Sequence, residues 1–180
     1  MAKINILDKS VYSRIAAGEV VERPFSVVKE LVENSIDAGA REISVTITDG
    51  GKESIVVTDD GCGMSAEDLP HAFLPHATSK IEKAEDLDAI MTLGFRGEAL
   101  ASVASVAKVT ILTCDEKSDI GCTMTAEGGV LGELDYYPAS RGTTITVKDL
   151  FYNTPARAKF MKSTKAEETD ITGMMARLIL

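Results

Sequence analysis

The stretch Phe25-Ser-Val-Val-Lys-Glu-Leu-Val-Glu-Asn-Ser-Ile-Asp-Ala-Gly39 predicts one amphipathic helix. Pro24 precedes it at the first helical position, where a missing N–H is no loss, and Gly39 is typical of the residue just past a helix end. With about 100° of rotation per residue, the apolar side chains fall on one side, which predicts packing on a core. They are Val27, Val28, Leu31, Val32 and Ala38.

On the opposite side, Glu30, Asn34 and Asp37 lie in one line along the helix, at i, i+4 and i+7. No Lys or Arg follows Glu30 at the pairing position that a solvated face usually fills. Two interpretations stay open from the helix alone. The line is an acidic solvent face, or the Asn34 amide oxygen coordinates a hard cation such as Mg²⁺ while the Glu30 carboxylate orients a water. For Asp37, helix capping or a water network is the better interpretation.

The composition is that of a single globular domain. The chain has 180 residues, of which 44% are hydrophobic, enough for one real core. Its formal charge of -9 means that any DNA affinity must come from a local basic patch. Cys62, Cys114 and Cys122 fit neither a zinc site nor a disulfide framework and predict free thiols in a reducing compartment. No run approaches the roughly 18 apolar residues of a membrane span, so we expect a cytoplasmic protein.

A predicted hairpin leads into a glycine-containing loop. Alternating apolar residues indicate strands over 42–48 and 54–58, and the second strand runs into Asp59-Asp-Gly-Cys-Gly-Met64. A plain turn explains this pattern. A carboxylate at the end of a buried strand, followed by Gly61 and Gly63, can also accept a hydrogen bond from an exocyclic amine while a flat ring lies over the backbone. Adenine carries such an amine.

The segment over 70–94 loses periodicity, and loops of this length are usually functional or disordered. Within it, Thr78, Ser79 and Lys80 offer two hydroxyls and a cation to an anion, although a solvated polar turn explains them equally. The loop Gly94-Phe-Arg-Gly-Glu-Ala-Leu100 then feeds a small-residue helix, whose free N–H groups favour an anion. A P-loop is rejected, because the chain contains no Gly-x-x-x-x-Gly-Lys-Ser/Thr.

The remainder of the chain is rich in strands. Antiparallel meander strands are predicted over 108–114, 121–127, 130–136 and 143–147. A helix begins at Pro155, and another is predicted over 167–180. Because no C-terminal cap follows Leu180, the sequence indicates a chain cut within its last helix.

Taken together and in this order, six motifs resemble the N-terminal ATPase domain of the MutL family of DNA mismatch-repair proteins, in the GHKL ATPase superfamily. The motifs are Ile15 to Pro24, Glu30 to Gly39, Asp59 to Gly63, His76 to Lys80, Gly94 to Leu100 and Phe151 to Arg157. The resemblance covers nearly the whole chain. It implies the Bergerat ATP-binding fold, an α/β (α+β) two-layer sandwich in which a mixed, mainly antiparallel sheet is covered by helices on one face. It also implies that residues 1–180 lack the family's second and C-terminal domains.

Carried over residue by residue, the resemblance implies a site for ATP and Mg²⁺. Glu30 is then the general base that activates water, and Asn34 coordinates the Mg²⁺ ion. Asp59 reads the adenine amine, with Gly61 and Gly63 beneath the ring. Other nucleotide contacts are implied in the lid, around the phosphates and near the Asp59 carboxylate that binds adenine. They are Thr78, Ser79, Lys80, Arg96, Gly97, Glu98, Ala99, Leu100 and Thr143. Asp60 stands where the family often has Asn, with little expected consequence.

The function implied is a conformational switch. ATP orders the lid loops around residues 70–100 and promotes association of two N-terminal domains, which coordinates mismatch recognition with downstream repair. The implied partners are a MutS-type mismatch-recognition protein, DNA through the full-length dimer, and a second copy, with no membrane. The alternative is a nucleotide-gated scaffold with negligible turnover, because the family's second domain supplies a lysine to the terminal phosphate. We therefore expect weak or undetectable hydrolysis by residues 1–180.

Overall fold

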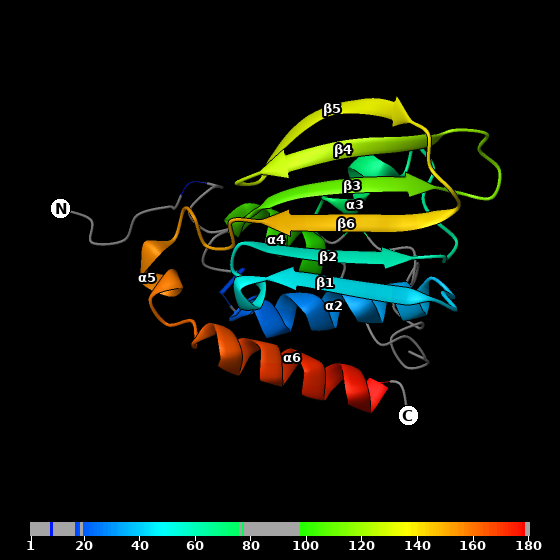
Figure 1. Cartoon of the computed structure of the whole chain (residues 1–180). Helices are drawn as coiled ribbons and strands as arrows, with labels where there is room; N and C mark the ends of the chain where they lie inside the picture. The colour runs from blue at the N-terminus through cyan, green and yellow to red at the C-terminus, as the bar shows by residue number, and fades with distance from the viewer. Residues whose placement is uncertain (1–7, 9–16, 19, 76, 78–97, 179–180) are drawn as a thin grey trace, which may run out of the picture.

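The computed structural model of the chain describes residues 8, 17–18, 20–75, 77 and 98–178. Six strands form one sheet in the order β1-β2-β6-β3-β4-β5 (Figure 1). All the described strand pairs are antiparallel. The strands are β1 (Ile43–Thr48), β2 (Ser54–Asp59), β3 (Lys108–Cys114), β4 (Gly121–Glu127), β5 (Val130–Tyr137) and β6 (Gly142–Lys148).

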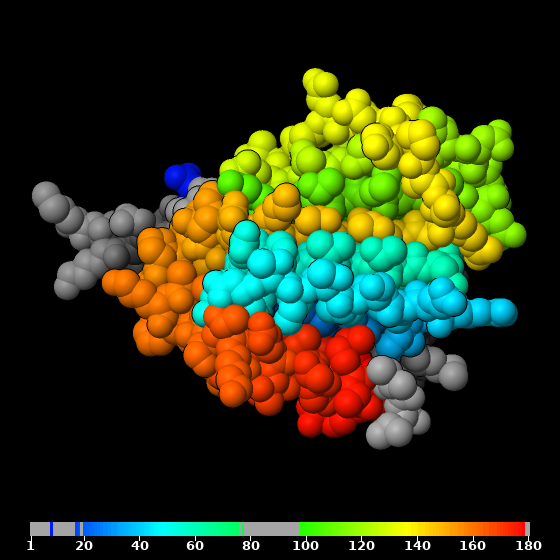
Figure 2. Space-filling view, in the orientation of Figure 1, coloured from blue at the N-terminus to red at the C-terminus, as the bar shows by residue number. Residues whose placement is uncertain are grey.

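Most of the helices lie against one face of this sheet or along its β1 edge, and one short helix, near residue 155, lies beyond the end of the strands (Figure 1). They are α2 (Pro24–Asp37), α3 (Leu69–Ala72), α4 (Ala99–Val106), α5 (Pro155–Ala158) and α6 (Thr164–Leu178), with a short 3-10 turn η1 (Asp49–Gly51). Among the described residues, no helix covers the other face, where strand side chains from β1 to β5 reach the surface (Figure 2). The predicted two-layer fold is confirmed. None of the described helices is long and apolar enough to cross a membrane.

The position of β6 differs from the predicted meander. β3, β4 and β5 do follow one another as a meander, whereas β6 lies between β2 and β3. In that place Val147 pairs with Ile55 on one side and with Val109 on the other. All three side chains are buried, so the central position extends an apolar row across the sheet. Strand periodicity is the same for an edge neighbour and a central strand, so it does not predict this order.

The apolar face of α2 is the centre of the core, as the helical periodicity predicts. Val27, Val28, Leu31 and Val32 are each at most 1% exposed and pack in one cluster with side chains from the sheet. Burial of each such side chain contributes about 1.5–3 kcal/mol relative to exposure. This packing fixes the rotation of α2 about its axis, and therefore fixes where its polar line points.

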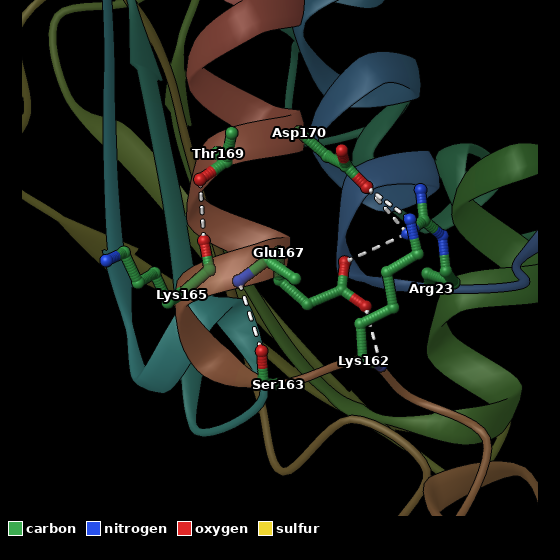
Figure 3. Close-up of polar contacts among 8 residues, drawn as sticks. Arg23, Lys162, Ser163, Lys165, Glu167, Thr169 and Asp170 are labelled. Carbon is green, nitrogen blue, oxygen red and sulfur yellow. Dashed lines mark hydrogen bonds and ion pairs between the residues drawn. The ribbon is translucent and has the colours of Figure 1, made fainter.

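A cluster of charged residues joins the N-terminal end of α2 to α6, and we call it the α2–α6 ion cluster (Figure 3). Nη1 of Arg23, just before α2, donates to Oδ2 of Asp170 at 2.8 Å and lies 3.7 Å from Oε2 of Glu167. Glu167 is fully buried, and its Oε1 accepts the backbone N–H of Lys162 at 3.1 Å. Lys162 Nζ also donates to Asp170, so Lys162 and Arg23 together lower the pKa of that carboxyl group.

Candidate functional site

The carboxylate of Asp59, the last residue of β2, is held by two donors from different segments. Its Oδ2 accepts the hydroxyl of Ser35 on α2 at 2.7 Å, and its Oδ1 accepts the backbone N–H of Gly61 at 2.9 Å. Asp59 is half-buried, whereas Ser35 is 4% exposed. An ionised carboxylate offers about four lone-pair positions, so its donors among the described residues leave two of them unused. Asp59 is therefore fixed in place and can still accept hydrogen bonds.

Three neighbouring strands bring further hydroxyl groups beside Asp59. Thr143 on β6 is the register partner of both Asp59 and Thr113 on β3. Thr113 is fully buried, and its Oγ1 accepts the N–H of Met64 at 2.9 Å and lies 3.0 Å from Oγ1 of Thr143. It also contacts the carbonyl oxygen of Gly142 at 3.0 Å. The family resemblance implies that Thr143 lies near the Asp59 carboxylate, and the two residues are neighbours in the sheet register.

The glycines after Asp59 are required by close backbone packing. Gly63 has φ +68°, and a Cβ there would overlap the carbonyl oxygen of Cys114. At Gly61 a Cβ would lie 2.9 Å from Cβ of Ala38 and 3.0 Å from Oδ1 of Asp59. Gly63 thus adopts a positive φ, which glycine tolerates more readily than other residues. Because both contacts are with protein atoms, the glycine pattern alone does not require a ligand.

Glu30, Asn34 and Asp37 occupy the polar line of α2, and all three are half-buried. The nearest cation on the helix, Lys29, forms an ion pair with Glu33 at 2.9 Å. That pairing raises the pKa of Lys29 above its ordinary value, chiefly through the hydrogen bond that Lys29 donates to Glu33. The side-chain oxygens of Glu30 and Asn34, one helical turn apart, are donors of the kind that Mg²⁺ prefers. The donor set of the line therefore fits a magnesium ion.

Only part of the predicted lid lies within the described residues. Glu98 is the residue before α4, and Ala99 and Leu100 begin this helix, which packs against α2. Glu98 makes no side-chain cap to α4, so the first N–H groups of the helix are not satisfied by it. The remaining predicted contacts, Thr78, Ser79, Lys80, Arg96 and Gly97, lie outside the described residues.

Sequence reasoning missed three residues that shape this site. Ser35 was one of them, although it follows Leu31 by one turn on the apolar stripe of α2. A polar residue on a buried stripe must find a partner, and that signal was available. The others are Thr113 and Arg141, whose Nε donates to the carbonyl oxygen of Gly61 at 3.3 Å. No local sequence pattern indicates either contact.

Comparison with known proteins points to one family. Residues 22–137 match the family described as histidine kinase-, DNA gyrase B- and HSP90-like ATPase. A DNA mismatch repair protein MutL from Desulforamulus reducens is 55% identical over the whole chain, which spans 28% of that relative's length. Solved structures also match, and the two described next are similar to the chain in sequence as well as in fold.

One is the Aquifex aeolicus MutL ATPase domain complexed with ADP, which is 31% identical with a TM-score of 0.69 over 87% of this chain and 54% of that one. The other is the N-terminal domain of a DNA repair protein, 33% identical with a TM-score of 0.75 over 91% of this chain and 46% of that one. The chain belongs to the histidine kinase-, DNA gyrase B- and HSP90-like ATPase family, and within it matches the ATPase domain of the MutL mismatch-repair proteins.

Proposed function

We propose that the chain binds ATP at the C-terminal end of α2 and hydrolyses it with Mg²⁺, as the switch domain of a MutL-type DNA mismatch-repair protein. The observation that carries the proposal is Asp59, whose two oxygens each accept one hydrogen bond, while the described donors leave half of its lone pairs unused. Similarity to a MutL ATPase domain complexed with ADP supports the choice of nucleotide.

In this proposal the Asp59 carboxylate binds and recognises the adenine base. A carboxylate whose protein partners are all donors is an acceptor toward any ligand, so it fits the exocyclic amine of adenine. Thr143, in register with Asp59, adds a hydroxyl group at the same edge. Gly61 and Gly63 add no side chains of their own to the loop, so that the flat ring can lie against the backbone at these positions.

The polar line of α2, which contains Glu30 and Asn34, lies at the phosphate end of the nucleotide in this proposal. Asn34 holds the Mg²⁺ ion through its amide oxygen, and when bound this ion would offset the negative charge of the phosphates. Glu30, one turn earlier, takes a proton from the attacking water as general base. The rotation of α2 is fixed by its buried apolar face, so both groups approach the nucleotide from one side.

The phosphate contacts come from the segment before α4. We propose that Thr78, Ser79, Lys80, Arg96 and Gly97, together with Glu98, Ala99 and Leu100 at the start of α4, close over the phosphates. Free N–H groups at the start of a helix favour negative charge, which supports this end of α4 as part of the site.

ATP binding would order the lid and let two copies of the domain associate, and hydrolysis would release them. The partners proposed are a MutS-type mismatch-recognition protein and DNA, with the protein acting in the cytoplasm. Because the chain carries a formal charge of -9, DNA contact would come from the longer dimer. We expect weak or undetectable turnover from these 180 residues. Equal turnover in this chain and in one extended through the family's second domain would contradict that expectation.

Calorimetric titration with Mg²⁺ and a non-hydrolysable ATP analogue tests the proposal. We expect weaker binding in Asp59→Asn and Asn34→Ala, by about tenfold or more for the loss of a charge-assisted contact. Asp135→Asn is a matched control, because Asp135 is an exposed aspartate on β5, paired with Thr123. Full affinity in both site variants, or no binding by the unaltered chain, would overturn the proposal.

A further inference from the structure

Ser35 makes a contact that is unusual for a serine inside a helix. Such a serine ordinarily donates to the carbonyl oxygen one turn back, and Leu31 O does lie 3.2 Å from Oγ of Ser35. Oδ2 of Asp59 is closer, at 2.7 Å, and carries negative charge. Since a hydroxyl has one proton, the shorter charge-assisted bond takes it. Ser35 therefore donates its single hydroxyl proton to a residue of another element, Asp59 on β2.

We infer that Ser35 is the positioning residue that orients the Asp59 carboxylate and thereby sets the preference for a purine that carries an amine. The inference rests on the proposed function, because it takes Asp59 as the contact to the base. The terminal torsion of an aspartate is broad and weakly restrained. Here Gly61 N–H fixes Oδ1 and Ser35 fixes Oδ2, so the plane of the carboxylate is set before any ligand arrives.

This arrangement predicts a selective defect. In Ser35→Ala, Oδ2 loses its donor and the carboxylate turns about Gly61 N–H, so its acceptors no longer face the amine. A base with a carbonyl in place of the amine gains nothing from the alignment. We therefore expect the Kd for ATP to rise about tenfold, the size of one charge-assisted hydrogen bond, and the Kd for inosine triphosphate to stay within about twofold.

Ser105 provides a matched control. It is a buried serine, 4% exposed, and its hydroxyl donates to Ser102 O within its own helix at 2.8 Å. Ser105→Ala deletes the same atom from a helix without touching Asp59. We expect it to leave the ratio of the two Kd values unchanged.

A second measurement needs no nucleotide. If Ser35 holds Asp59, then the Asp59 contact to Gly61 N–H loosens in Ser35→Ala, and the Gly61 amide proton moves upfield and exchanges faster with solvent in NMR spectra. Ser105→Ala leaves that amide unchanged. An unchanged Gly61 amide in Ser35→Ala would overturn the positioning role even if the variant bound ATP poorly.

The outcomes separate this inference from the proposed function. If Asp59→Asn discriminates ATP from inosine triphosphate as the unaltered chain does, or if the unaltered chain binds neither, then the proposed function fails and the inference with it. If Asp59→Asn loses the discrimination while Ser35→Ala weakens both nucleotides equally, or neither, then only the role of Ser35 is refuted. A selective loss of ATP affinity in Ser35→Ala, absent in Ser105→Ala, supports it.

Discussion

The two ends of α2 use charge in opposite ways. At the N-terminal end, the carboxylate of Glu167 is fully buried and faces Arg23. The carboxylate of Asp170 accepts hydrogen bonds from both Arg23 and Lys162. At the C-terminal end, Asp59 is half-buried and is held by a hydroxyl group and a backbone N–H. Within the described residues, no cation is among the hydrogen-bond partners of Asp59.

This difference separates anchoring from binding. The buried carboxylate of Glu167 faces the positive charge of Arg23, so its charge is balanced within the protein. A carboxylate oriented by neutral donors keeps its negative charge available to a ligand. We therefore expect changes at the first end to affect chiefly folding stability, and changes at the second to affect chiefly nucleotide binding.

The largest expected effect is on stability at the anchoring end. Glu167→Ala leaves a cavity at a fully buried side chain and Lys162 N–H without its acceptor, although Arg23 keeps Asp170, so the free energy of unfolding should fall by about 3–5 kcal/mol. Urea unfolding at neutral pH measures this loss. Glu168→Ala, at an exposed neighbour on the same helix, should change it little. Equal losses in the two variants would refute the anchoring role.

The glycines at the binding end allow a second comparison. In Gly63→Ala, the added Cβ overlaps the carbonyl oxygen of Cys114 at a residue with φ +68°. In Gly39→Ala, φ is similar at +73°, but a Cβ meets nothing within 4 Å. We expect Gly39→Ala to cost about 1 kcal/mol for the backbone alone, and Gly63→Ala about 2–4 kcal/mol because the overlap is added. Thermal unfolding of both variants checks the difference, and equal shifts in Tm would show that close packing at Gly63 is unimportant.

The smallest effect is expected at Asp60. Its Oδ1 accepts the N–H groups of Arg41 at 2.7 Å and Glu42 at 2.9 Å, and these bonds lower the pKa of the carboxyl group. Its charged form therefore stabilises the fold at pH values above about 4, and this contribution disappears as the pH falls through the lowered pKa. An asparagine oxygen can accept both bonds at every pH. We predict that Asp60→Asn is slightly less stable than the unaltered chain at neutral pH.

That difference in unfolding free energy should narrow in acid, because the unaltered chain alone loses its carboxylate. Urea unfolding of both chains at about pH 7 and about pH 3 measures the change. A difference that stays constant over this range would contradict the role given to Asp60.

Local patterns predicted most of the secondary structure. The 3.6-residue periodicity and Pro24 predicted α2 and its buried face, and the alternation of Val and Ile predicted the strands closely. Neither pattern carries information on spatial order, which is why β6 was expected beside β5. The same limit hid the α2–α6 ion cluster, since Arg23 and Asp170 are 147 residues apart in the chain.

The candidate site divides in the same way. The position of Asp59 was predictable, because a carboxylate at the end of an apolar strand is a local feature. The role of Ser35 depends on a contact between α2 and β2 that only the packed fold creates. Its place on the apolar stripe indicated burial but not the partner.

A chemical-shift titration of the ¹⁵N-labelled chain with Mg²⁺ and a non-hydrolysable ATP analogue tests nucleotide binding at the C-terminal end of α2 most directly. Both ends of the helix report in one experiment. We predict the largest amide shifts at Ser35, at residues 59–64 and at Thr143, with little change at Arg23 and Asp170. Amide shifts that are largest at the α2–α6 ion cluster and absent at residues 59–64 would contradict nucleotide binding at the C-terminal end of α2.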